Sequence, residues 1–348
     1  MMRRILKTLA TLCIASVAIT MSVKPTSAIS GDIAMPPDAA TEWLNSPPQT
    51  ATDLRGKVVV VQFWTYTCVN WRRTLPYMRA WSAKYRDQDL VVIGVHTPEF
   101  DFEENAQNVR TQLGVMHIDY AVAIDNQHAI WNAFHNVYWP ALYLLDPQGN
   151  IRYRQFGEGE YARTEREIQK LLAESGRHPS SGLAVVAPLG AEVPADEGNL
   201  RSPESYVGYQ MAERFASKGG AVPNGRHDYV APNHLSLNDW ALSGSWTMGR
   251  QAAVLDGASG KISYRFHARD LNLVMAPSVL STPVRFRVFI DGHSPGPANG
   301  ADTDEQGYGT VREARMYQLI RQSGKITDRE FVIEFLSSGV SAYDFTFG

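Results

Sequence analysis

Cysteine is scarce in this chain of 348 residues, which contains only Cys13 and Cys68. Two thiols cannot build the dense disulfide network of a small secreted domain, so the fold must depend on hydrophobic cores. An excess of one charge is also lacking, since 33 basic and 36 acidic residues give a net charge of -3. This balance excludes the basic surface typical of nucleic-acid-binding proteins, and we expect no nucleic-acid partner.

The first 28 residues have the features of a cleavable signal peptide. A basic segment from Met1 to Lys7 precedes an apolar stretch from Thr8 to Val23, and Thr26-Ser27-Ala28 supplies the small residues that a signal peptidase recognises. The apolar stretch is short for a membrane span. We therefore expect a periplasmic or secreted protein that begins near Ile29, does not span the membrane after cleavage, and keeps Cys68 as its single thiol.

The length favours two domains, and the sequence pattern of the first is typical of an α/β fold. Val58 to Trp64 is a continuous apolar run, which indicates a strand buried on both faces of a parallel sheet. The remaining strands are predicted over Leu90 to Val95 and Tyr120 to Ile124, and helices over Leu75 to Arg86, Glu103 to Leu113 and Asn126 to His135. The alternation of strand and helix predicts crossover connections and a mostly parallel sheet.

The pattern changes after Pro140. Ala141 to Leu145 and Ile151 to Phe156 flank a turn and predict an antiparallel hairpin. Thr164 to Leu172 predicts an amphipathic helix that closes the first domain, with Thr164 as a candidate N-cap.

The second half of the chain alternates apolar and polar residues with a period of two. Ile262, Tyr264 and Phe266 show this pattern, and similar runs recur up to Phe347. Half-buried strands separated by Gly-rich turns predict an all-β sandwich of the jelly-roll type. Residues 177–204 are rich in Pro, Gly, Ala and Ser and are interpreted as an interdomain linker. The predicted organisation is a signal peptide over 1–28, an α/β domain over 29–176, the linker, and a β-sandwich over 205–348.

Cys68 lies between the strand that ends at Trp64 and the helix that contains Leu75. Ligands and chemistry gather at the carboxyl ends of the strands in open α/β sheets. A helix N-terminus favours a thiolate by ~0.3–2 kcal/mol, and Arg72 is expected to add to this effect. Aromatic residues nearby would oppose it by desolvating the sulfur. We predict that Cys68 is the nucleophile, although the alternative of a small buried hydrophobe stays open.

The residues around Cys68 resemble the thioredoxin-like TlpA family (redoxins) of exported thiol–disulfide oxidoreductases, and most of all the periplasmic C-terminal part of DipZ proteins. The resemblance rests on Leu54-Arg55-Gly56-Lys57-Val58-Val59, Phe63-Trp64-Thr65-Tyr66-Thr67-Cys68, Pro76, Asp89 to Phe100, Tyr138-Trp139-Pro140-Ala141 and Phe156-Gly157-Glu158-Gly159. It runs from about Trp43 to Leu172 and continues more weakly into the β-rich region. It implies a thioredoxin-like first domain in which Pro140 is a cis-proline that faces the thiol.

The departures from the family pattern concern the second thiol. The family's Cys-x-x-Cys site reads Cys68-Val69-Asn70-Trp71 here, so the resolving cysteine is missing. Gln62 stands where thioredoxins carry a buried acid, and Leu142 stands where the DipZ-like pattern has an acidic residue. Because these acids manage protons for the second thiol, their joint absence fits a site that never forms an internal disulfide.

Three functions remain open for one thiol. The first is monothiol or isomerase-like disulfide exchange, in which exported proteins or small thiols and disulfides are the partners and an outside thiol completes the cycle. The second is a one-cysteine peroxidase, for which Thr65 matches one element of the peroxiredoxin pattern and Val61 replaces the expected proline. The third is a redox-inactive binding protein that uses the β-sandwich. No cofactor is implied.

The surroundings of the site and the other candidate residues complete the prediction. The predicted surroundings of Cys68 are Gln62, Trp64, Thr65, Trp71, Arg72, Trp139 and Pro140. His96 and Glu99 follow a strand at the same sheet edge and are candidates for a proton relay, or His96 is a turn histidine with ordinary hydrogen bonds. No metal site is predicted, since Asp302-x-Asp304-x-x-Gly307 is only part of a calcium loop. In the β-domain, Trp240 and Trp246 either stack on a carbohydrate ligand or belong to the core.

Overall fold

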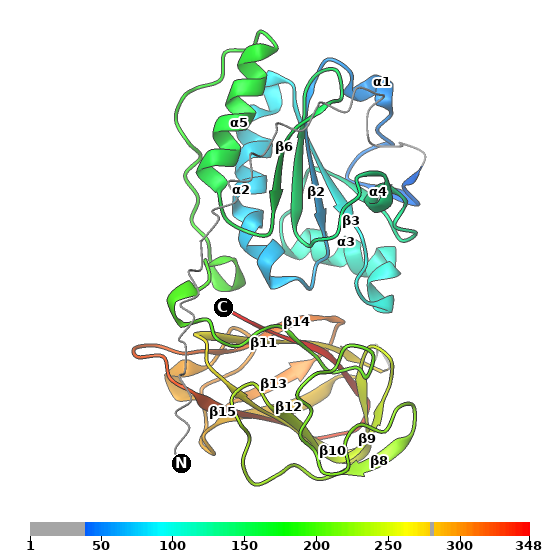
Figure 1. Cartoon of the computed structure of the whole chain (residues 1–348), viewed down its shortest axis with the longest axis vertical. Helices are drawn as coiled ribbons and strands as arrows, with labels where there is room; N and C mark the ends of the chain where they lie inside the picture. The colour runs from blue at the N-terminus through cyan, green and yellow to red at the C-terminus, as the bar shows by residue number, and fades with distance from the viewer. Residues whose placement is uncertain (1–38, 279–281) are drawn as a thin grey trace, which may run out of the picture.

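The computed structural model describes residues 39–278 and 282–348, which form two bodies stacked along the long axis of the molecule (Figure 1). The first body holds a six-stranded sheet with helices against it, and the second holds a ten-stranded sheet. The predicted signal peptide, with Cys13, lies outside the described residues. Within the residues that are described, no helix combines the length and the apolar character needed to cross a membrane.

The first sheet has the strand order β1-β4-β3-β2-β5-β6. Its strands are β1 (Glu42–Leu44), β2 (Val58–Trp64), β3 (Leu90–His96), β4 (Ala121–Ile124), β5 (Ala141–Leu145) and β6 (Ile151–Phe156). The pairs β2–β3 and β3–β4 are parallel, whereas β1, β5 and β6 pair antiparallel to their neighbours. All seven residues of β2 are buried, as expected for a central strand covered on both faces. The predicted strands and hairpin are confirmed.

The helices of the first body differ from their predicted bounds at both ends. They are α1 (Ala51–Leu54), α2 (Val69–Tyr85), α3 (Ala106–Val115), α4 (Ala129–Ala133) and α5 (Tyr161–Glu174), with 3-10 turns η2 (Arg86–Gln88) and η3 (Asp101–Glu104). Helix α2 begins directly after Cys68. Helix α5 begins before the predicted cap, because Glu160 is its N-cap in the left-handed region with φ 51°, and Thr164 is buried inside the helix.

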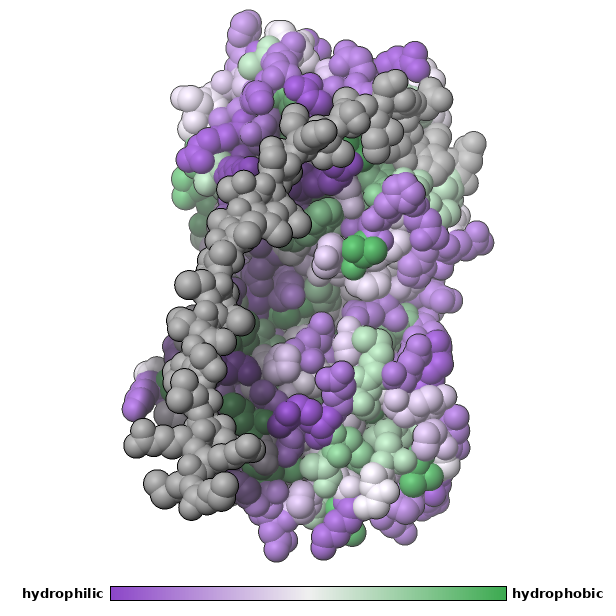
Figure 2. All heavy atoms as spheres, in the orientation of Figure 1, coloured by the Kyte–Doolittle hydropathy of each residue, from purple (hydrophilic) through white to green (hydrophobic). Residues whose placement is uncertain are grey.

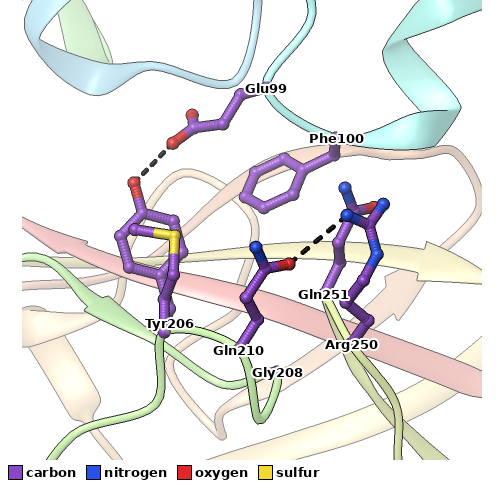
Figure 3. A pocket seen from close by; sticks show the side chains of 8 residues that line it. Glu99, Phe100, Tyr206, Gly208, Gln210, Arg250 and Gln251 are labelled. Atoms are coloured by element: carbon purple, nitrogen blue, oxygen red, sulfur yellow. Dashed lines mark hydrogen bonds between the residues drawn. The ribbon is translucent and has the colours of Figure 1, made fainter.

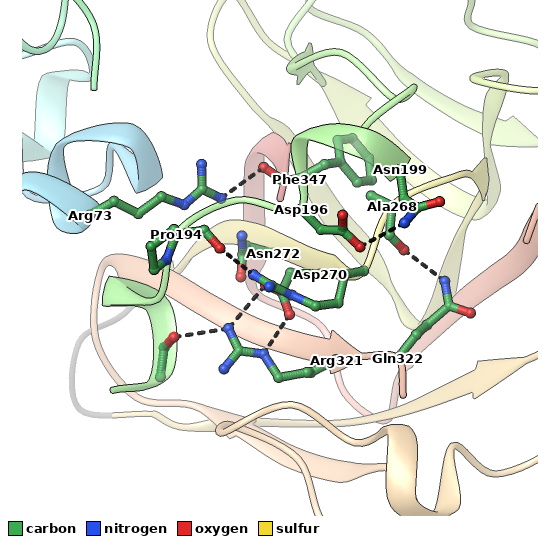
Figure 4. Close-up of polar contacts among 12 residues, drawn as sticks. Arg73, Pro194, Asp196, Asn199, Ala268, Asp270, Asn272, Arg321, Gln322 and Phe347 are labelled. Carbon is green, nitrogen blue, oxygen red and sulfur yellow. Dashed lines mark hydrogen bonds and ion pairs between the residues drawn. The ribbon is translucent and has the colours of Figure 1, made fainter. Parts of the chain in front are cut away.

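The segment between the two sheets contains two 3-10 turns, η4 (Gly190–Glu192) and η5 (Glu197–Asn199). It is tied to both bodies. Arg79 of α2 donates to Glu192 at 2.9 Å, and Arg321 of the second sheet donates to the Gly190 carbonyl at 2.9 Å and to Asp270 at 2.7 Å (Figure 4). The predicted domain boundaries stay a prediction. These hydrogen bonds hold the segment against both bodies, unlike a freely flexible linker.

The second sheet is antiparallel at every pairing and curls around one core. Its strands are β7 (Ser205–Tyr206), β8 (Arg226–Tyr229), β9 (Trp240–Met248), β10 (Ala253–Phe266), β11 (Asp270–Pro277), β12 (Val284–Ile290), β13 (Tyr308–Val311), β14 (Arg315–Arg321), β15 (Arg329–Phe335) and β16 (Val340–Phe347); a 3-10 turn, η6 (Gly296–Ala298), joins β12 to β13. The first part of β10 pairs with β16 and its second part pairs with β15.

The bend that lets β10 serve two neighbours lies at a register shift between Leu255 and Gly260. A Cβ atom on Gly260 would lie 2.5 Å from the Leu255 side chain and 2.9 Å from Trp246 Nε1, so only glycine fits there. The residues predicted to face the core are buried, including Ile262, Tyr264 and Phe266. The second body is therefore an all-β domain, as predicted.

The two bodies share an apolar contact at the N-terminus of α2. Val69 and Phe100 of the first body pack with Val274 and Met316 of the second. Beside this cluster, the buried Arg73 donates to Glu158 at 2.6 Å and to the Phe347 carbonyl at 3.1 Å (Figure 4). On the face shown in Figure 2, hydrophilic and hydrophobic residues are interspersed over both bodies. The all-β domain thus covers the end of α2 that carries Cys68.

Candidate functional site

Cys68 is the N-cap residue of α2, immediately beyond the carboxyl end of β2. Its backbone is extended (φ -68°, ψ 114°), and its N–H donates to the Thr65 carbonyl at 3.3 Å. The side chain makes no capping hydrogen bond, and the residue is only 8% exposed. The thiol is free. The position predicted from the sequence is thus the observed one, but solvent access to the sulfur is small.

Trp71 fills the position one helical turn after Cys68. Its ring is fully buried and stacks on Trp64, with ring centroids 4.2 Å apart. Trp71 Nε1 donates to Gln62 Oε1 at 3.0 Å, and Gln62 Nε2 donates to Thr74 Oγ1 at 3.0 Å. Thr74 Oγ1 in turn donates to the Trp71 carbonyl at 2.7 Å. Gln62 and Trp71, two departures from the family pattern, are therefore direct partners in one buried network.

The segment from Trp64 to Thr67 is buried between the sheet and the 3-10 turn η3. Trp64 lies over Gly94, where a Cβ atom would come within 2.7 Å of Trp64 Nε1. Thr65 is fully buried, and its Oγ1 has no hydrogen-bond partner among the described residues. Thr67 Oγ1 donates to Glu103 Oε1 at 2.6 Å. The loop that leads to Cys68 is thereby fixed by a buried carboxyl group.

Glu103 is a site residue that the sequence did not reveal. It is fully buried, and it also accepts the backbone N–H groups of Glu99 at 2.8 Å and Phe100 at 3.1 Å. Burial raises the pKa of Glu103, and these hydrogen bonds oppose the shift. In the sequence it was one polar residue of a predicted helix, and nothing in its spacing signalled a buried role.

His96 is the last residue of β3 and lies in the core. It is fully buried, and its ring stacks on Tyr66 with centroids 5.7 Å apart. Burial lowers the pKa of His96 to about 3, so the ring is neutral at physiological pH. Neither ring nitrogen has a hydrogen-bond partner among the described residues. His96 therefore lacks the ordinary hydrogen bonds of a turn histidine, because β3 extends far enough to carry it inside.

Glu99 faces the all-β domain. Its carboxylate accepts a hydrogen bond from the hydroxyl of Tyr206 of β7 (Figure 3). Burial, and after it the charges of the neighbouring Glu204 and Glu103, raise the pKa of Glu99 to about 8. Glu99 and Tyr206 line a small pocket of about 170 Å³ between the two bodies. No hydrogen bond joins Glu99 to His96 in the described part of the chain, so their role as a relay stays a prediction.

Arg72 is bonded to the backbone of the loop that precedes Cys68. Its Nε donates to the Tyr66 carbonyl at 3.3 Å, and burial followed by the charge of Arg315 lowers the pKa of Arg72 to about 10. Burial also raises the pKa of Cys68 well above its ordinary value, and the charges of Glu204 and Glu99 raise it further. The backbone N–H groups of Trp71 and Asn70 at the N-terminus of α2 oppose this rise, so the activation of Cys68 by the helix N-terminus stays a prediction.

Trp139 and Pro140 occupy the turn before β5. The Trp139–Pro140 peptide bond is cis. Trp139 Nε1 donates to the Thr97 carbonyl at 3.1 Å, and the Pro140 carbonyl accepts the Gly157 N–H at 2.8 Å. The turn is thereby bonded to the loop after β3 and to the end of β6.

The candidate residues of the all-β domain have structural partners. Trp240 and Trp246 are fully buried, so neither ring is available to a carbohydrate. Asp302 accepts Arg315 at 2.6 Å and the Gln318 N–H at 2.8 Å, and Asp304 accepts the Tyr308 N–H at 2.8 Å. Among the described residues, no group of three or more histidine, cysteine, aspartate or glutamate side chains is placed to hold a metal.

The fold and the site define a thioredoxin-like protein with an appended all-β domain. Residues 36–154 match the AhpC/TSA family, and residues 202–348 match the family described as thioredoxin like C-terminal domain. The first match lies in the body with the six-stranded sheet, and the second match covers the all-β domain.

Its relatives include thiol–disulfide oxidoreductases. Protein DipZ of Mycobacterium bovis is 36% identical over 249 residues, which cover 70% of this chain and 35% of DipZ, so the chain spans about a third of that relative. Thiol-disulfide oxidoreductase YkuV of Bacillus subtilis is 28% identical over 38% of this chain and 89% of YkuV. A solved thiol-disulfide isomerase from Corynebacterium glutamicum has 24% identity, a TM-score of 0.36, and coverage of 38% of this chain and 92% of that one.

Proposed function

We propose that this chain carries out thiol–disulfide exchange through one thiol, that of Cys68. The observation that carries the proposal is the pairing of a free cysteine at the N-cap of α2 with a buried tryptophan, Trp71, at the place of a resolving cysteine. The relationship to thiol–disulfide oxidoreductases supports the same chemistry.

The proposed reaction has two steps. The Cys68 thiol loses its proton to solvent, and the thiolate attacks one sulfur of a substrate disulfide. The substrate S–S bond breaks, a Cys68–substrate disulfide forms, and the other substrate sulfur leaves as a thiolate. A second thiol, from the substrate or from a small external thiol, then attacks the mixed disulfide and releases Cys68. Trp71 has no sulfur, so no internal step competes with this release.

The test is direct capture of the mixed disulfide. Reduced full-length protein is mixed with oxidised glutathione, and mass spectrometry locates the adduct on Cys68; scrambled ribonuclease A then reports isomerase activity. We expect an adduct that dithiothreitol removes and that Cys68→Ala cannot form. A Cys68 that stays unmodified in the folded protein would contradict the proposal.

A one-cysteine peroxidase is a second candidate, which the AhpC/TSA match favours. Here the Cys68 thiolate would attack the peroxide O–O bond and become a sulfenic acid, with release of water or an alcohol. One external thiol would then form a disulfide with Cys68 and release water, and a second would reduce it. A sulfenic acid trapped on Cys68 at dilute hydrogen peroxide, faster than on free cysteine, supports this candidate; oxidation no faster than free cysteine removes it.

A redox-inactive binding role is the third candidate, and the small exposure of Cys68 favours it. It predicts that Cys68→Ser leaves the biological function intact and that deletion of the all-β domain abolishes it. A phenotype for Cys68→Ser would exclude this role.

We further propose that the protein acts in the periplasm or outside the cell on exported proteins or small thiols. The basic and apolar sequence before Ile29 supports this location. Mass spectrometry of the N-terminus from fractionated cells tests it: a mature protein that begins near Ile29 outside the cytoplasm is the expected result.

A further inference from the structure

One histidine of the all-β domain is nearly buried and uses only one of its ring nitrogens in a hydrogen bond. His267 lies in the turn between β10 and β11, and its side chain is 8% exposed. Its Nδ1 lies 2.6 Å from Asp328 Oδ1, and because a carboxylate only accepts hydrogen bonds, Nδ1 is the donor in this pair. The other ring nitrogen, Nε2, has no hydrogen-bond partner among the described residues and is open to solvent.

The backbone around His267 is held on both sides. The Arg201 N–H donates to the His267 carbonyl at 3.0 Å, and the His267 N–H donates to Ser202 Oγ at 2.8 Å. At the next residue, the Ala268 carbonyl accepts Gln322 Nε2 at 2.7 Å (Figure 4). The imidazole is therefore preorganised, since both its backbone and its Nδ1 are fixed.

The ring of His267 lines an open pocket of about 530 Å³. This volume lies within the range of small-molecule sites, which is about 300–1,000 Å³. Two exposed cations, Arg201 and Lys325, line the same pocket. The remaining lining residues are Asn199, Gly324, Ile326, Thr327 and Asp328. The pocket thus combines one nearly buried imidazole with two cationic side chains.

The charges that line the pocket favour an anion. Asp328 is the one acidic residue among the lining residues, and it is bonded to His267 and lies 4.0 Å from Arg265 Nη2. Arg201 and Lys325 form no ion pair with an acid among the described residues. Their charges are therefore available to a ligand, whereas the charge of Asp328 is already matched.

The acids around this pocket have other places or partners. Glu204 lines a separate groove, which Arg201 also lines. Asp196 accepts Asn199 Nδ2 at 2.8 Å (Figure 4), and Glu330 stands opposite Arg265 in the pairing of β10 with β15. None of these three acids lines the pocket of His267.

We propose that the pocket formed by His267, Arg201 and Lys325 binds a small organic anion through an oxyanion group. In its imidazolium form, His267 donates Nε2–H to the oxyanion, and Asp328 stabilises the charged ring through Nδ1. The two cations supply further attraction and disfavour a metal ion at the same place. Cys68 is no part of this pocket, so the inference is independent of the proposed thiol chemistry.

The experiment is a titration of the full-length chain, labelled with ¹³C at its isoleucine methyl groups and followed by nuclear magnetic resonance. Ile326 lines the pocket and reports its occupancy. Sulfate and acetate are the probes, and sodium chloride keeps the ionic strength constant. We expect a saturable shift of the Ile326 methyl signal, with tighter binding at about pH 6 than at about pH 8, because Nε2 must carry a proton. The probe that binds more tightly distinguishes a tetrahedral oxyanion from a carboxylate.

The variants separate a ligand contact from a structural role. In His267→Asn the amide keeps a donor at the place of Nδ1 but removes Nε2, so we expect binding of the preferred probe about tenfold weaker or more, without the pH dependence. Lys325→Gln and Arg201→Gln should each weaken binding by about threefold. The exposed control Lys218→Gln, which does not line the pocket, should leave the affinity unchanged.

Three results would overturn the inference: a shift of Ile326 that does not saturate with either probe, an affinity equal at both pH values, or full binding by His267→Asn. If His267→Asn does not fold, the two exposed positions decide. Unchanged binding in both Lys325→Gln and Arg201→Gln would then refute the site.

Discussion

Gln62 accepts a hydrogen bond from the indole of Trp71 at 3.0 Å, and these are the two positions at which a dithiol site would carry a buried acid and a resolving cysteine. The amide and the indole satisfy each other, and Thr74 closes the network. A carboxylate at position 62 would have no second thiol with which to exchange a proton, because Trp71 stands at that place. The two departures are thus one structural change, and a site restricted to a single thiol is its consequence.

The first prediction concerns this pair. Trp71→Phe leaves Gln62 Oε1 unpaired in the core, and we expect a loss of about 1–3 kcal/mol in the free energy of unfolding. Gln62→Leu made in the Trp71→Phe background should cost less than Gln62→Leu alone, since the partner is already gone. Urea unfolding followed by circular dichroism measures both effects. Strictly additive losses would show that the hydrogen bond contributes nothing.

The second prediction concerns Glu99. Its pKa is raised to about 8 in the folded protein, so the folded state binds more protons than the unfolded state between about pH 4.5 and 8. The free energy of unfolding should therefore fall as the pH rises through this range and level off above it. Glu99→Gln should flatten this slope, whereas the exposed control Glu305→Gln should not. A slope that Glu99→Gln leaves unchanged would assign the pH dependence to other groups.

The third prediction concerns His96, for which the free energy of unfolding changes with pH in the opposite direction. Its pKa is lowered to about 3, so the unfolded state binds the additional proton between about pH 6.5 and 3. His96 should destabilise the fold progressively as the pH falls through this range. His96→Phe should reduce the loss of stability in acid, and the exposed His178→Gln serves as the control. Acid unfolding curves followed by intrinsic fluorescence measure the difference, and identical curves would refute the buried neutral state.

The fourth prediction concerns the contact between the domains. The side chain of Arg73 is 2% exposed and bonds both Glu158 and the Phe347 carbonyl. Arg73→Met leaves a half-buried carboxylate unpaired and cuts a link to the all-β domain, and we expect a loss of about 3–5 kcal/mol. Scanning calorimetry should also show the unfolding of the two domains separating into two transitions.

The matched control for that variant is Arg86→Met. Arg86 pairs with Asp119 at the surface, with side chains 60% and 62% exposed, so the expected change is about 0–1 kcal/mol. Equal effects of the two substitutions would mean that Arg73 does not couple the domains.

Local sequence patterns were sufficient to predict the elements that build the first sheet. The run from Val58 to Trp64 became β2 with the predicted bounds, since a continuous apolar segment between turns satisfies both its backbone and its side chains only as a central strand. Helix starts were less predictable. The N-cap of α5 is Glu160 in the left-handed region, a conformation that residue preferences do not signal at this position.

The sequence by itself determined that one thiol, Cys68, stands at the end of a buried strand and that no resolving cysteine follows it. These are local facts of order and composition. Only the tertiary structure decided how far the neighbourhood of that thiol is buried, because Val274 and Met316, which pack on Val69, come from a domain whose approach no local pattern encodes. A helix N-terminus favours a thiolate, whereas burial raises the pKa of the Cys68 thiol, and burial is a property of the packed structure.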